Sequence, residues 1–271
     1  MANEKQGKVY LVGAGPGDPE LLTRKADRLI REARLLLHDD LVAAEIVALA
    51  GANAEVVNVG KRCGQKRITQ AEINERMIEA ARRGVEVVRL KSGDPAIFGR
   101  LGEELEALRT ANVAFEIVPG ITAGIAAAAV LGLSLTDRRT ASRLLIASAH
   151  HAAEHSGNEG SSQEKEDWSG LVNGGTTLMI YMPGHGLAGL REELLSAGLR
   201  AETPVIIVSK ATTHQQQHTE ATLRELGAGE PLPAPSVLLI GEAVRRASCE
   251  GKPEEISALL RDADAMLATD A

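Results

Sequence analysis

Two aspartates follow apolar runs of the chain, at positions where the strands of a sheet are expected to end. Asp39 follows the run Arg34–Leu37 after one residue, His38, and Asp94 follows the run Val85–Leu90. A carboxylate at such a place can take up a proton as a general base, or accept hydrogen bonds from a ligand's hydroxyl and amino groups. Either residue can instead be structural, as a loop cap or the first residue of an Asx turn. The residues alone leave both interpretations open.

A glycine-rich segment, Gly13–Asp18, follows the apolar run Val9–Val12. Glycine allows the backbone N–H groups to approach a ligand closely. Asp39 lies about 20 residues further on, where a dinucleotide-binding fold places its ribose-binding acid. The spacing, however, is G-x-G-x-G rather than G-x-G-x-x-G, and Pro16 lacks an N–H donor. An NAD(P)-dependent oxidoreductase is therefore an alternative with weak support.

Two basic clusters lie beside further expected strand ends. They contain Lys61, Arg62, Lys66 and Arg67 in the first, and Arg138, Arg139 and Arg143 in the second. Charge runs usually mark solvated loops, but two such clusters would also suit a polyanionic ligand. Cys63 and Cys249 have no partners at metal-binding spacing, so no metal site is expected.

The composition limits the possible partners. The chain has 271 residues, a net charge of -7, two cysteines and only 2% aromatic residues. The negative charge disfavours a nucleic-acid partner, and so few aromatics disfavour base stacking. No apolar run approaches the ~20 residues of a membrane-spanning helix, and the N-terminus does not read as a signal peptide. Two cysteines fit a reducing cytosol, so we expect a cytoplasmic protein.

Apolar runs and helix signals alternate in the first part of the chain. Strands are predicted at Val9–Val12, Arg34–Leu37, Glu55–Val59, Val85–Leu90 and Phe115–Val118. Helix starts are predicted at Asp18-Pro19-Glu20 and at the capping box Thr69–Glu72, and Arg100–Thr110 is predicted to be helical. This alternation predicts a parallel sheet with helices on both faces. Ligands of such sheets bind beyond the carboxyl ends of the strands.

A second α/β series follows Gly120. It consists of predicted helices at Thr122–Leu131 and Leu187–Ala197, and strands at Leu144–Ser148, Thr176–Met182, Pro204–Ser209 and Ser236–Gly241. The chain is therefore expected to form two α/β domains, residues 1–120 and 121–249, the second with a polar insertion at 150–170. Residues 250–271 are expected to form an acidic tail helix outside the core.

These segments, taken in order, resemble those of the tetrapyrrole methyltransferases. The matching segments are Gly13–Thr23, His38–Val42, Gly60–Gly64, Gln70–Asn74, Val87–Arg100, Val118–Ala123, Leu135–Arg138, Tyr181–Pro183 and Pro204–Thr212. Any one of them is weak alone, but nine in the family's order are specific. The sequence departs from the family pattern at Ser92, Asp137 and Pro183, where the family has glycine, histidine and glycine.

The resemblance implies two α/β domains forming a cleft, a homodimer, and S-adenosylmethionine bound in the cleft, with S-adenosylhomocysteine as its product. The family's cofactor positions fall on Pro16, Ser92, Gly93, Asp94, Ile97, Thr122, Ala123, Met182 and Ala211. Its proposed base falls on Asp39 and its proposed proton donor on Lys61. Arg62 and Arg138 are candidates for holding the carboxylates of the substrate.

The activity implied by the resemblance is methyl transfer to C2 and then C7 of uroporphyrinogen III. The product would be precorrin-2, a precursor of sirohaem and cobalamin. Two alternatives stay open besides the oxidoreductase. One is a methyltransferase of the same family acting on a later precorrin ring, and the other is a tetrapyrrole-binding module without catalysis.

Overall fold

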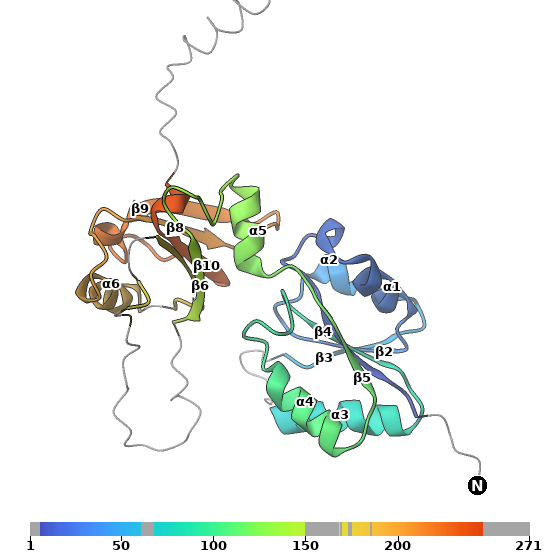
Figure 1. The fold of residues 1–271 in the computed structure, drawn as a ribbon. Helices are drawn as coiled ribbons and strands as arrows, with labels where there is room; N and C mark the ends of the chain where they lie inside the picture. Colours follow the sequence, from blue (N-terminus) through green and yellow to red (C-terminus); the bar gives the residue numbers. More distant parts are fainter. Residues whose placement is uncertain are drawn as a thin grey trace, which may run out of the picture.

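The computed structural model describes residues 6–60, 68–149, 168, 170–172, 175–184 and 186–245. The predictions for Lys61, Arg62, most of the polar insertion and the acidic tail lie outside these residues. Within them the chain forms two five-stranded sheets, one from each half of the sequence (Figure 1). The fold is mixed α/β, as the sequence predicts.

The first sheet is entirely parallel. Its strands are β1 (Val9–Gly13), β2 (Leu35–His38), β3 (Glu55–Asn58), β4 (Val87–Lys91) and β5 (Phe115–Val118), in the order β3-β2-β4-β1-β5. All four neighbouring pairs are parallel. The carboxyl ends of the strands therefore meet at one edge, where a ligand of such a sheet is expected.

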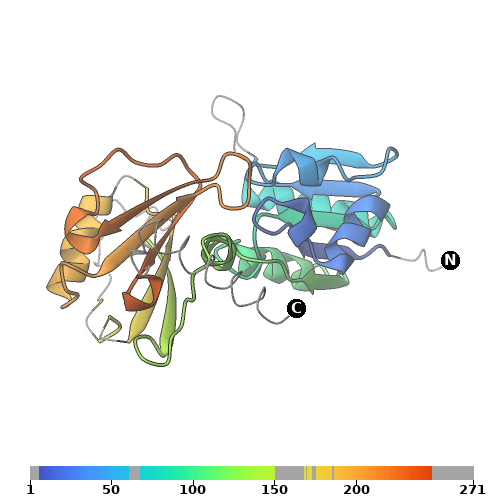
Figure 2. The same ribbon diagram turned by 90° about the horizontal axis from the view of Figure 1, so that it is seen from above.

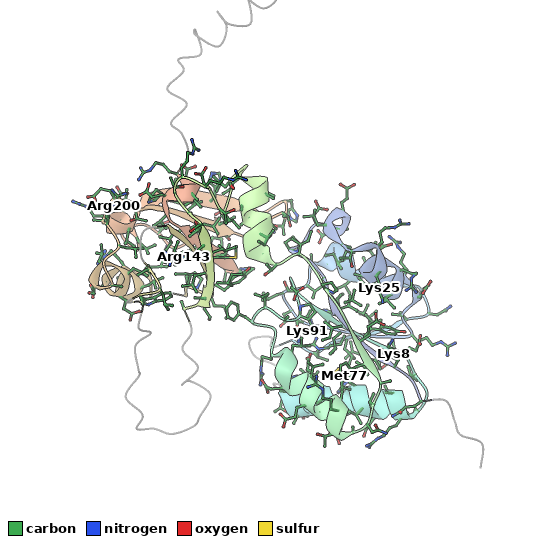
Figure 3. All side chains as sticks on the ribbon, in the orientation of Figure 1. Lys8, Lys25, Met77, Lys91, Arg143 and Arg200 are labelled. Carbon is green, nitrogen blue, oxygen red and sulfur yellow. The ribbon has the colours of Figure 1, made fainter. Side chains whose placement is uncertain are left out.

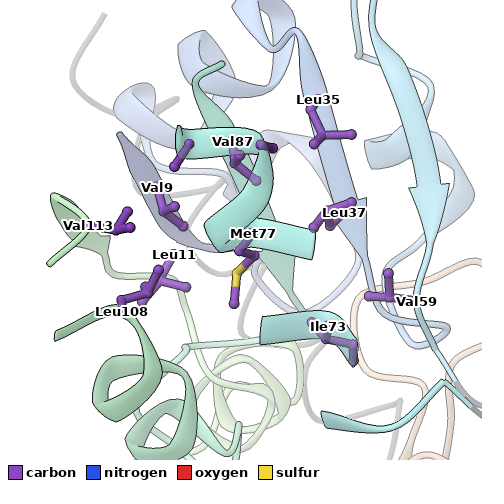
Figure 4. Packing of buried hydrophobic residues seen from close by; sticks show 12 residues of the cluster. Val9, Leu11, Leu35, Leu37, Val59, Ile73, Met77, Val87, Leu108 and Val113 are labelled. Atoms are coloured by element: carbon purple, nitrogen blue, oxygen red, sulfur yellow. The ribbon is translucent and has the colours of Figure 1, made fainter. Parts of the chain in front are cut away.

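Helices cover both faces of this sheet, as predicted. Helices α1 (Arg24–Glu32) and α2 (Ala44–Val47) pack on one face, and α3 (Gln70–Arg82) and α4 (Leu101–Thr110) on the other. Met77 of α3 is fully buried among side chains that include Leu11 and Leu37 (Figure 4). Strand alternation places Leu37, Arg89 and Lys91 on this same face, under α3 and α4. Arg89 and Lys91 are therefore buried although both are charged.

One predicted helix start is displaced. Asp18 does act as an N-cap, but only for the short 3-10 turn η1 (Pro19–Leu21), and α1 begins at Arg24 after the N-cap Thr23. The capping box of Thr69 and Glu72 forms as predicted and starts α3. The sequence before α1 carries two competing N-cap signals, and the second begins the α-helix because Pro19–Leu21 tightens into a separate turn.

The second sheet is mixed rather than parallel. Its strands are β6 (Arg143–Ser148), β7 (Thr176–Tyr181), β8 (Pro204–Ser209), β9 (Gln217–Thr222) and β10 (Ser236–Ile240), in the order β6-β7-β10-β8-β9. Only β6 and β7 pair in parallel. The polar strand β9 was not predicted, because an edge strand this exposed lacks an apolar signal. The short loop before it allows only antiparallel pairing with β8.

Helix α5 (Ala123–Val130) lies between the two sheets and packs on the second (Figures 1 and 2). Ala127 and Ala128 are buried against a core that includes Met179 and Leu239. A Cβ at Gly124 would lie 2.2 Å from the Met179 sulfur, so the helix approaches β7 closely. Helix α6 (Leu187–Ser196) covers the other face of this sheet. Among the described residues, no helix is both long and apolar enough to cross a membrane.

Candidate functional site

Three loops meet backbone to backbone at the carboxyl edge of the first sheet. Gly15 and Gly93, which follow β1 and β4, exchange two backbone hydrogen bonds of 3.1 and 2.8 Å. A Cβ on Gly120, after β5, would lie 2.2 Å from the Gly93 carbonyl oxygen and 2.9 Å from the Gly13 Cα. Gly13 and Gly120 are required because a Cβ would collide with backbone atoms, whereas Gly15 and Gly93 are favoured by their positive φ angles of 68° and 69°. The glycine-marked strand ends of the sequence thus form one continuous platform.

Asp94 joins two of these loops. Its Oδ1 accepts a hydrogen bond from the Ala96 amide (2.8 Å), and its Oδ2 accepts one from the Gly120 amide (3.0 Å). The Asx turn considered from the sequence is therefore present. A carboxylate has about four acceptor positions, so two remain for a ligand. The structural and the binding interpretations of Asp94 are compatible.

A cavity opens beside Asp94. It has a volume of about 450 Å³ and is lined by Asp94, Ile97, Gly120, Ile121, Thr122 and Ile125. This size lies within the usual range for small-molecule sites. Three residues predicted to bind the cofactor, Asp94, Ile97 and Thr122, line it together, although they come from two different loops.

Tyr181, at the end of β7, connects the second half of the chain to Thr122, which lines this cavity. The Tyr181 hydroxyl lies 2.6 Å from the Thr122 Oγ1 and accepts a hydrogen bond from the Gly124 amide (2.9 Å). Its ring also contacts the ring of Phe98, with centroids 5.3 Å apart. Burial raises the pKa of Tyr181, which keeps the phenol protonated at neutral pH. Tyr181 thus ties the start of α5 and the loop after β4 to the second sheet.

The loop between β8 and β9 also reaches the first half (Figure 2). The Asp18 amide donates a hydrogen bond to the Thr212 Oγ1 (3.2 Å), and the Thr212 amide donates one to the Gln216 side chain (2.8 Å). A second cavity of about 540 Å³ lies here, lined by Asp18, Leu21, Ile121, Ile125, Ala126, Ala129, Val130, Thr212, Thr213 and Gln216. It shares the lining residues Ile121 and Ile125 with the first cavity, so the two cavities adjoin, and we refer to them together as the groove.

Several non-glycine residues near this groove have left-handed backbone conformations. They are Phe98, Arg100, Met182, Lys210 and Thr212, with φ angles between 48° and 66°. Such conformations cost free energy and are concentrated at functional sites. Phe98 and Met182 are also 44% and 42% exposed, which is unusual for large apolar side chains. The strain and the exposed apolar side chains both point to a ligand-binding role for this region.

Asp39 lies at the end of β2, next to the loops of this platform in the sheet order. Its Oδ1 accepts a hydrogen bond of 2.6 Å from the Arg89 guanidinium. The neighbouring Asp40 accepts from the Asn58 side chain instead (2.7 Å), so the two adjacent carboxylates have different surroundings. Arg89 is 2% exposed, while the Asp39 side chain is 32% exposed. Asp39 therefore has a solvent-accessible carboxylate that is held by the buried guanidinium of Arg89.

The remaining predicted residues are dispersed. Pro16, Ser92 and Ala123 are half-buried and Gly93 is buried, whereas the Ala211 side chain packs in the core of the second sheet. Arg138 is exposed on the loop before β6. Asp137 pairs with Arg139 (2.9 Å), and this guanidinium lowers the pKa of Asp137 to about 2. Lys61 and Arg62 lie outside the described residues.

The geometry does not favour the dinucleotide alternative. Such a site needs the glycine turn to lead directly into a helix N-terminus. Here Gly13–Gly17 leads into the 3-10 turn η1, and α1 begins only at Arg24. The Gly15 amide is already bonded to Gly93. Among the described residues, no group of three or more His, Cys, Asp or Glu side chains could hold a metal ion.

Sequence reasoning missed the side chains that hold this site together. Arg89, Glu104 and Tyr181 all form contacts that support predicted site residues. The signal for Arg89 was a charge inside a strand that is otherwise apolar, because such a strand in a parallel sheet is buried on both faces. No comparable signal marked Phe98, whose role follows from its left-handed backbone, its exposure and its contact with Tyr181.

Comparison with known proteins identifies this arrangement. The family model of the tetrapyrrole (corrin/porphyrin) methylases matches residues 8–227, which is most of the chain. The chain belongs to this family. The whole first sheet, strands β6 to β9 of the second sheet and the loops around the groove lie within the match, and only β10 of the second sheet lies beyond it. The groove is therefore part of the methylase fold rather than an addition to it.

Individual methylases are similar to this chain over most of its length. The uroporphyrinogen-III C-methyltransferase of Paracoccus denitrificans is 40% identical over 92% of this chain and 86% of its own length. The crystal structure of uroporphyrin-III C-methyl transferase from Thermus thermophilus complexed with S-adenyl homocysteine is 38% identical. It covers 88% of this chain and 99% of that chain, with a TM-score of 0.73.

Two further comparisons limit what these similarities mean. A cobalt precorrin-4 methyltransferase matches the methylase fold with a TM-score of 0.75 but is only 28% identical. Siroheme synthases are 41% and 43% identical, yet the chain spans only 48% and 50% of their length. The fold is thus common to several methylases, and the higher identity lies with those acting on uroporphyrinogen III.

Proposed function

We propose that this methylase transfers methyl groups from S-adenosylmethionine to C2 and C7 of uroporphyrinogen III, which gives precorrin-2. The observation that carries the proposal is the match to the Thermus thermophilus enzyme, complexed with S-adenyl homocysteine, at 38% identity over 88% of this chain. The cobalt precorrin-4 methyltransferase has an equally similar fold at lower identity. A later precorrin ring is therefore the less favoured substrate.

The platform and the cavity fit S-adenosylmethionine chemically. Gly93 has a φ of +69°. A Cβ at this position would point to Thr122 and would reduce the space beside this cavity-lining residue. The remaining acceptor positions of Asp94 suit the hydroxyls or the amino group of such a ligand. Ile97, Ile121 and Ile125 provide an apolar wall. We assign Pro16, Ser92, Ala123, Met182 and the backbone of Ala211 to the same site on the family resemblance.

Catalysis then depends on alignment and on removal of one proton. Bound S-adenosylmethionine supplies an already activated methyl group, so the protein mainly aligns the carbon that receives it. That carbon sits in a ring that must lose a proton when it is alkylated. The Asp39 carboxylate, 32% exposed at a strand end, is the candidate base, and Lys61 is the candidate proton donor.

Cations bind the substrate in this proposal. Uroporphyrinogen III carries several carboxylates, and guanidinium groups bind carboxylates with two parallel hydrogen bonds. Arg138 is exposed and free of the Asp137–Arg139 ion pair, which makes it a suitable contact. Arg62 is the second candidate on the strength of the basic cluster that contains it.

The organisation of the chain is part of the proposal. Each sheet has its own buried core, and α5 packs on the second sheet, which supports a boundary near residue 120. A homodimer is proposed on the family resemblance, because the exposed apolar side chains Val56 and Ile117 lie on the two opposite edge strands of the first sheet and form no single patch. The charge of -7 and the two cysteines support a cytoplasmic protein without a nucleic-acid partner.

The test is an anaerobic assay of the purified protein with S-adenosylmethionine and uroporphyrinogen III. The expected result is a product with two added methyl groups, seen by mass spectrometry, and saturable S-adenosylhomocysteine binding by calorimetry. Binding of the tetrapyrrole without methyl transfer would favour a binding module. Methylation of a later precorrin, but not of uroporphyrinogen III, would favour the other ring methyltransferase.

A further inference from the structure

A buried network of charges lies directly behind Asp39. The Arg89 guanidinium donates three hydrogen bonds: Nη2 to Asp39 Oδ1 (2.6 Å), Nε to Glu104 Oε1 (3.0 Å) and Nη1 to the Leu90 carbonyl (3.3 Å). Lys91 donates to the same Glu104 oxygen (3.0 Å). The network connects β4, α4 and the end of β2, on the sheet face that α3 and α4 cover.

Exposure falls sharply from one end of the network to the other. The Asp39 side chain is 32% exposed, whereas those of Arg89, Lys91 and Glu104 are 2%, 4% and 0% exposed. Lys91 lies at the end of the first sheet that faces the second sheet (Figure 3). The half-buried Gln70 of α3 also donates a hydrogen bond to Glu104 Oε1 (3.3 Å). Of the four charged side chains, Asp39 is the one that a substrate in solution can reach.

The network is poorly explained by stability. Burying charges costs several kcal/mol each, and apolar residues of similar size are often equally or more stabilising. Burial, together with the nearby Arg89 charge, lowers the pKa of Lys91. The Oε2 of Glu104 is buried without a hydrogen-bond partner among the described residues, and that adds a further cost. Because burying these charges costs free energy, packing alone does not account for the network.

We propose that Arg89 is the positioning residue of the candidate base, and that Glu104 fixes Arg89. The proposal rests on the function assigned to Asp39 above. A guanidinium is a rigid planar fork, so the Nε bond to Glu104 sets the direction in which Nη2 points. The bond at Oδ1 orients the Asp39 carboxylate. It leaves Oδ2, which accepts no hydrogen bond within the described part of the chain, to take up the proton.

The same contacts could act only as a clamp between β4 and α4. A clamp would affect folding and cofactor binding, and its effect on turnover would be independent of Asp39. A positioning residue acts through Asp39, so its contribution disappears once the base is removed. A double-mutant cycle between Arg89 and Asp39 separates the two roles.

The experiment uses the full chain and the variants Arg89→Lys, Asp39→Asn and the double variant. Lysine keeps the charge but has no fork, so it cannot hold Glu104 and Asp39 in the same way. We expect Arg89→Lys to lower kcat by ~10-fold or more, because small misplacements of a reacting group are costly. The KM for uroporphyrinogen III and the S-adenosylhomocysteine Kd should hardly change. The double variant should be no slower than Asp39→Asn.

Lys91→Met is the matched control. It removes a buried cation that contacts the same Glu104 oxygen at the same distance, 3.0 Å, but makes no hydrogen bond to Asp39. Its kcat should stay near the wild-type value even if its stability changes. If Arg89→Lys does not fold, as judged by circular dichroism, Glu104→Gln replaces it in the cycle, with the same expectation of no added loss beside Asp39→Asn.

Several outcomes would overturn the inference. One is a folded Arg89→Lys variant with wild-type kcat, and another is a double variant whose loss equals the product of the single losses to within about twofold. Both leave the proposed function intact, because the wild-type protein still methylates. Wild-type turnover in Asp39→Asn would overturn the assignment of the base and the role of Arg89 together. A wild-type protein without methyl transfer would overturn the proposed function itself.

Discussion

The two sheets contribute to the groove in different ways. The parallel sheet offers loops that follow β1, β4 and β5, and these meet through backbone atoms at Gly15, Gly93 and Gly120. The mixed sheet contributes side chains instead, chiefly the Tyr181 hydroxyl and the Thr212 hydroxyl. A parallel sheet brings all its carboxyl ends to one edge, whereas a mixed sheet divides them between two. The first sheet therefore builds the platform, and the second covers it.

This difference predicts where substitutions are costly. On the platform, an added Cβ meets backbone, as at Gly120, and neither partner can move aside. On the covering side, an added Cβ at Gly124 meets the flexible Met179 side chain. Chemistry that needs fixed geometry is thus expected on the parallel sheet, and adjustable contacts on the mixed one. The predictions that follow test that division.

The largest effect is expected at Asp39, at the end of β2. Asp39→Asn preserves size but cannot take up a proton, so turnover should fall by ~10²-fold or more if the residue is a general base. The S-adenosylhomocysteine Kd, measured by calorimetry, should stay unchanged because the residue acts on the substrate. Asp40→Asn is the control, since Asp40 bonds to Asn58 instead. Near-wild-type turnover in Asp39→Asn would leave alignment of the methyl group as the main source of catalysis.

A smaller effect is expected at Asp94. Asp94→Ala removes the acceptor of the Ala96 and Gly120 amides and the oxygens offered to the cofactor. Hydrogen bonds to charged groups contribute ~1.5–3 kcal/mol, so S-adenosylhomocysteine should bind roughly 10- to 150-fold more weakly. Calorimetry and urea unfolding of the same variant separate binding from stability. A loss of stability with unchanged affinity would reduce Asp94 to a loop residue.

Tyr181 tests the covering side. Tyr181→Phe leaves the Gly124 amide and the Thr122 hydroxyl without this partner, so the free energy of unfolding should fall by about 1–3 kcal/mol. The S-adenosylhomocysteine affinity should change less than in Asp94→Ala, because the hydroxyl acts through Thr122. Tyr10→Phe is the control from the first sheet, where the ring lies 5.0 Å from the Lys8 ammonium. A larger affinity loss in Tyr181→Phe than in Asp94→Ala would contradict this division of roles between the two sheets.

The sequence predicted the parallel sheet better than the mixed one, for a physical reason. The strands of the first sheet are buried on both faces and read as continuous apolar runs, such as Val9–Val12. The exposed edge strand β9 carries no such run and was missed. The loops after β1, β4 and β5 were predicted because a close approach of backbone segments requires glycine. The contact between Arg89 and Glu104 was not predicted, because it depends on how α4 packs against β4.

The smallest effects are expected at two surface carboxylates, one in each half. Lys25 and Lys8 hold the pKa of Glu116 at about 2, below its usual 4.5, and Arg139 holds that of Asp137 at about 2, below 3.8. A lowered carboxyl pKa stabilises the fold above the unfolded pKa, and this contribution is lost as the pH falls toward the folded value. Glu116→Gln and Asp137→Asn should therefore be slightly less stable than wild type at neutral pH and should converge with it near pH 2.

Urea unfolding at a series of pH values measures both differences, which should be small because the pairs are exposed to solvent. If the halves unfold together, each substitution shifts the same single transition. If they unfold separately, Glu116→Gln shifts only the transition of the parallel sheet and Asp137→Asn only that of the mixed sheet. A difference from wild type that does not change with pH would show that these ion pairs do not act through their lowered pKa values. The pair of variants thus asks whether the platform and its cover are coupled in folding as they are in the groove.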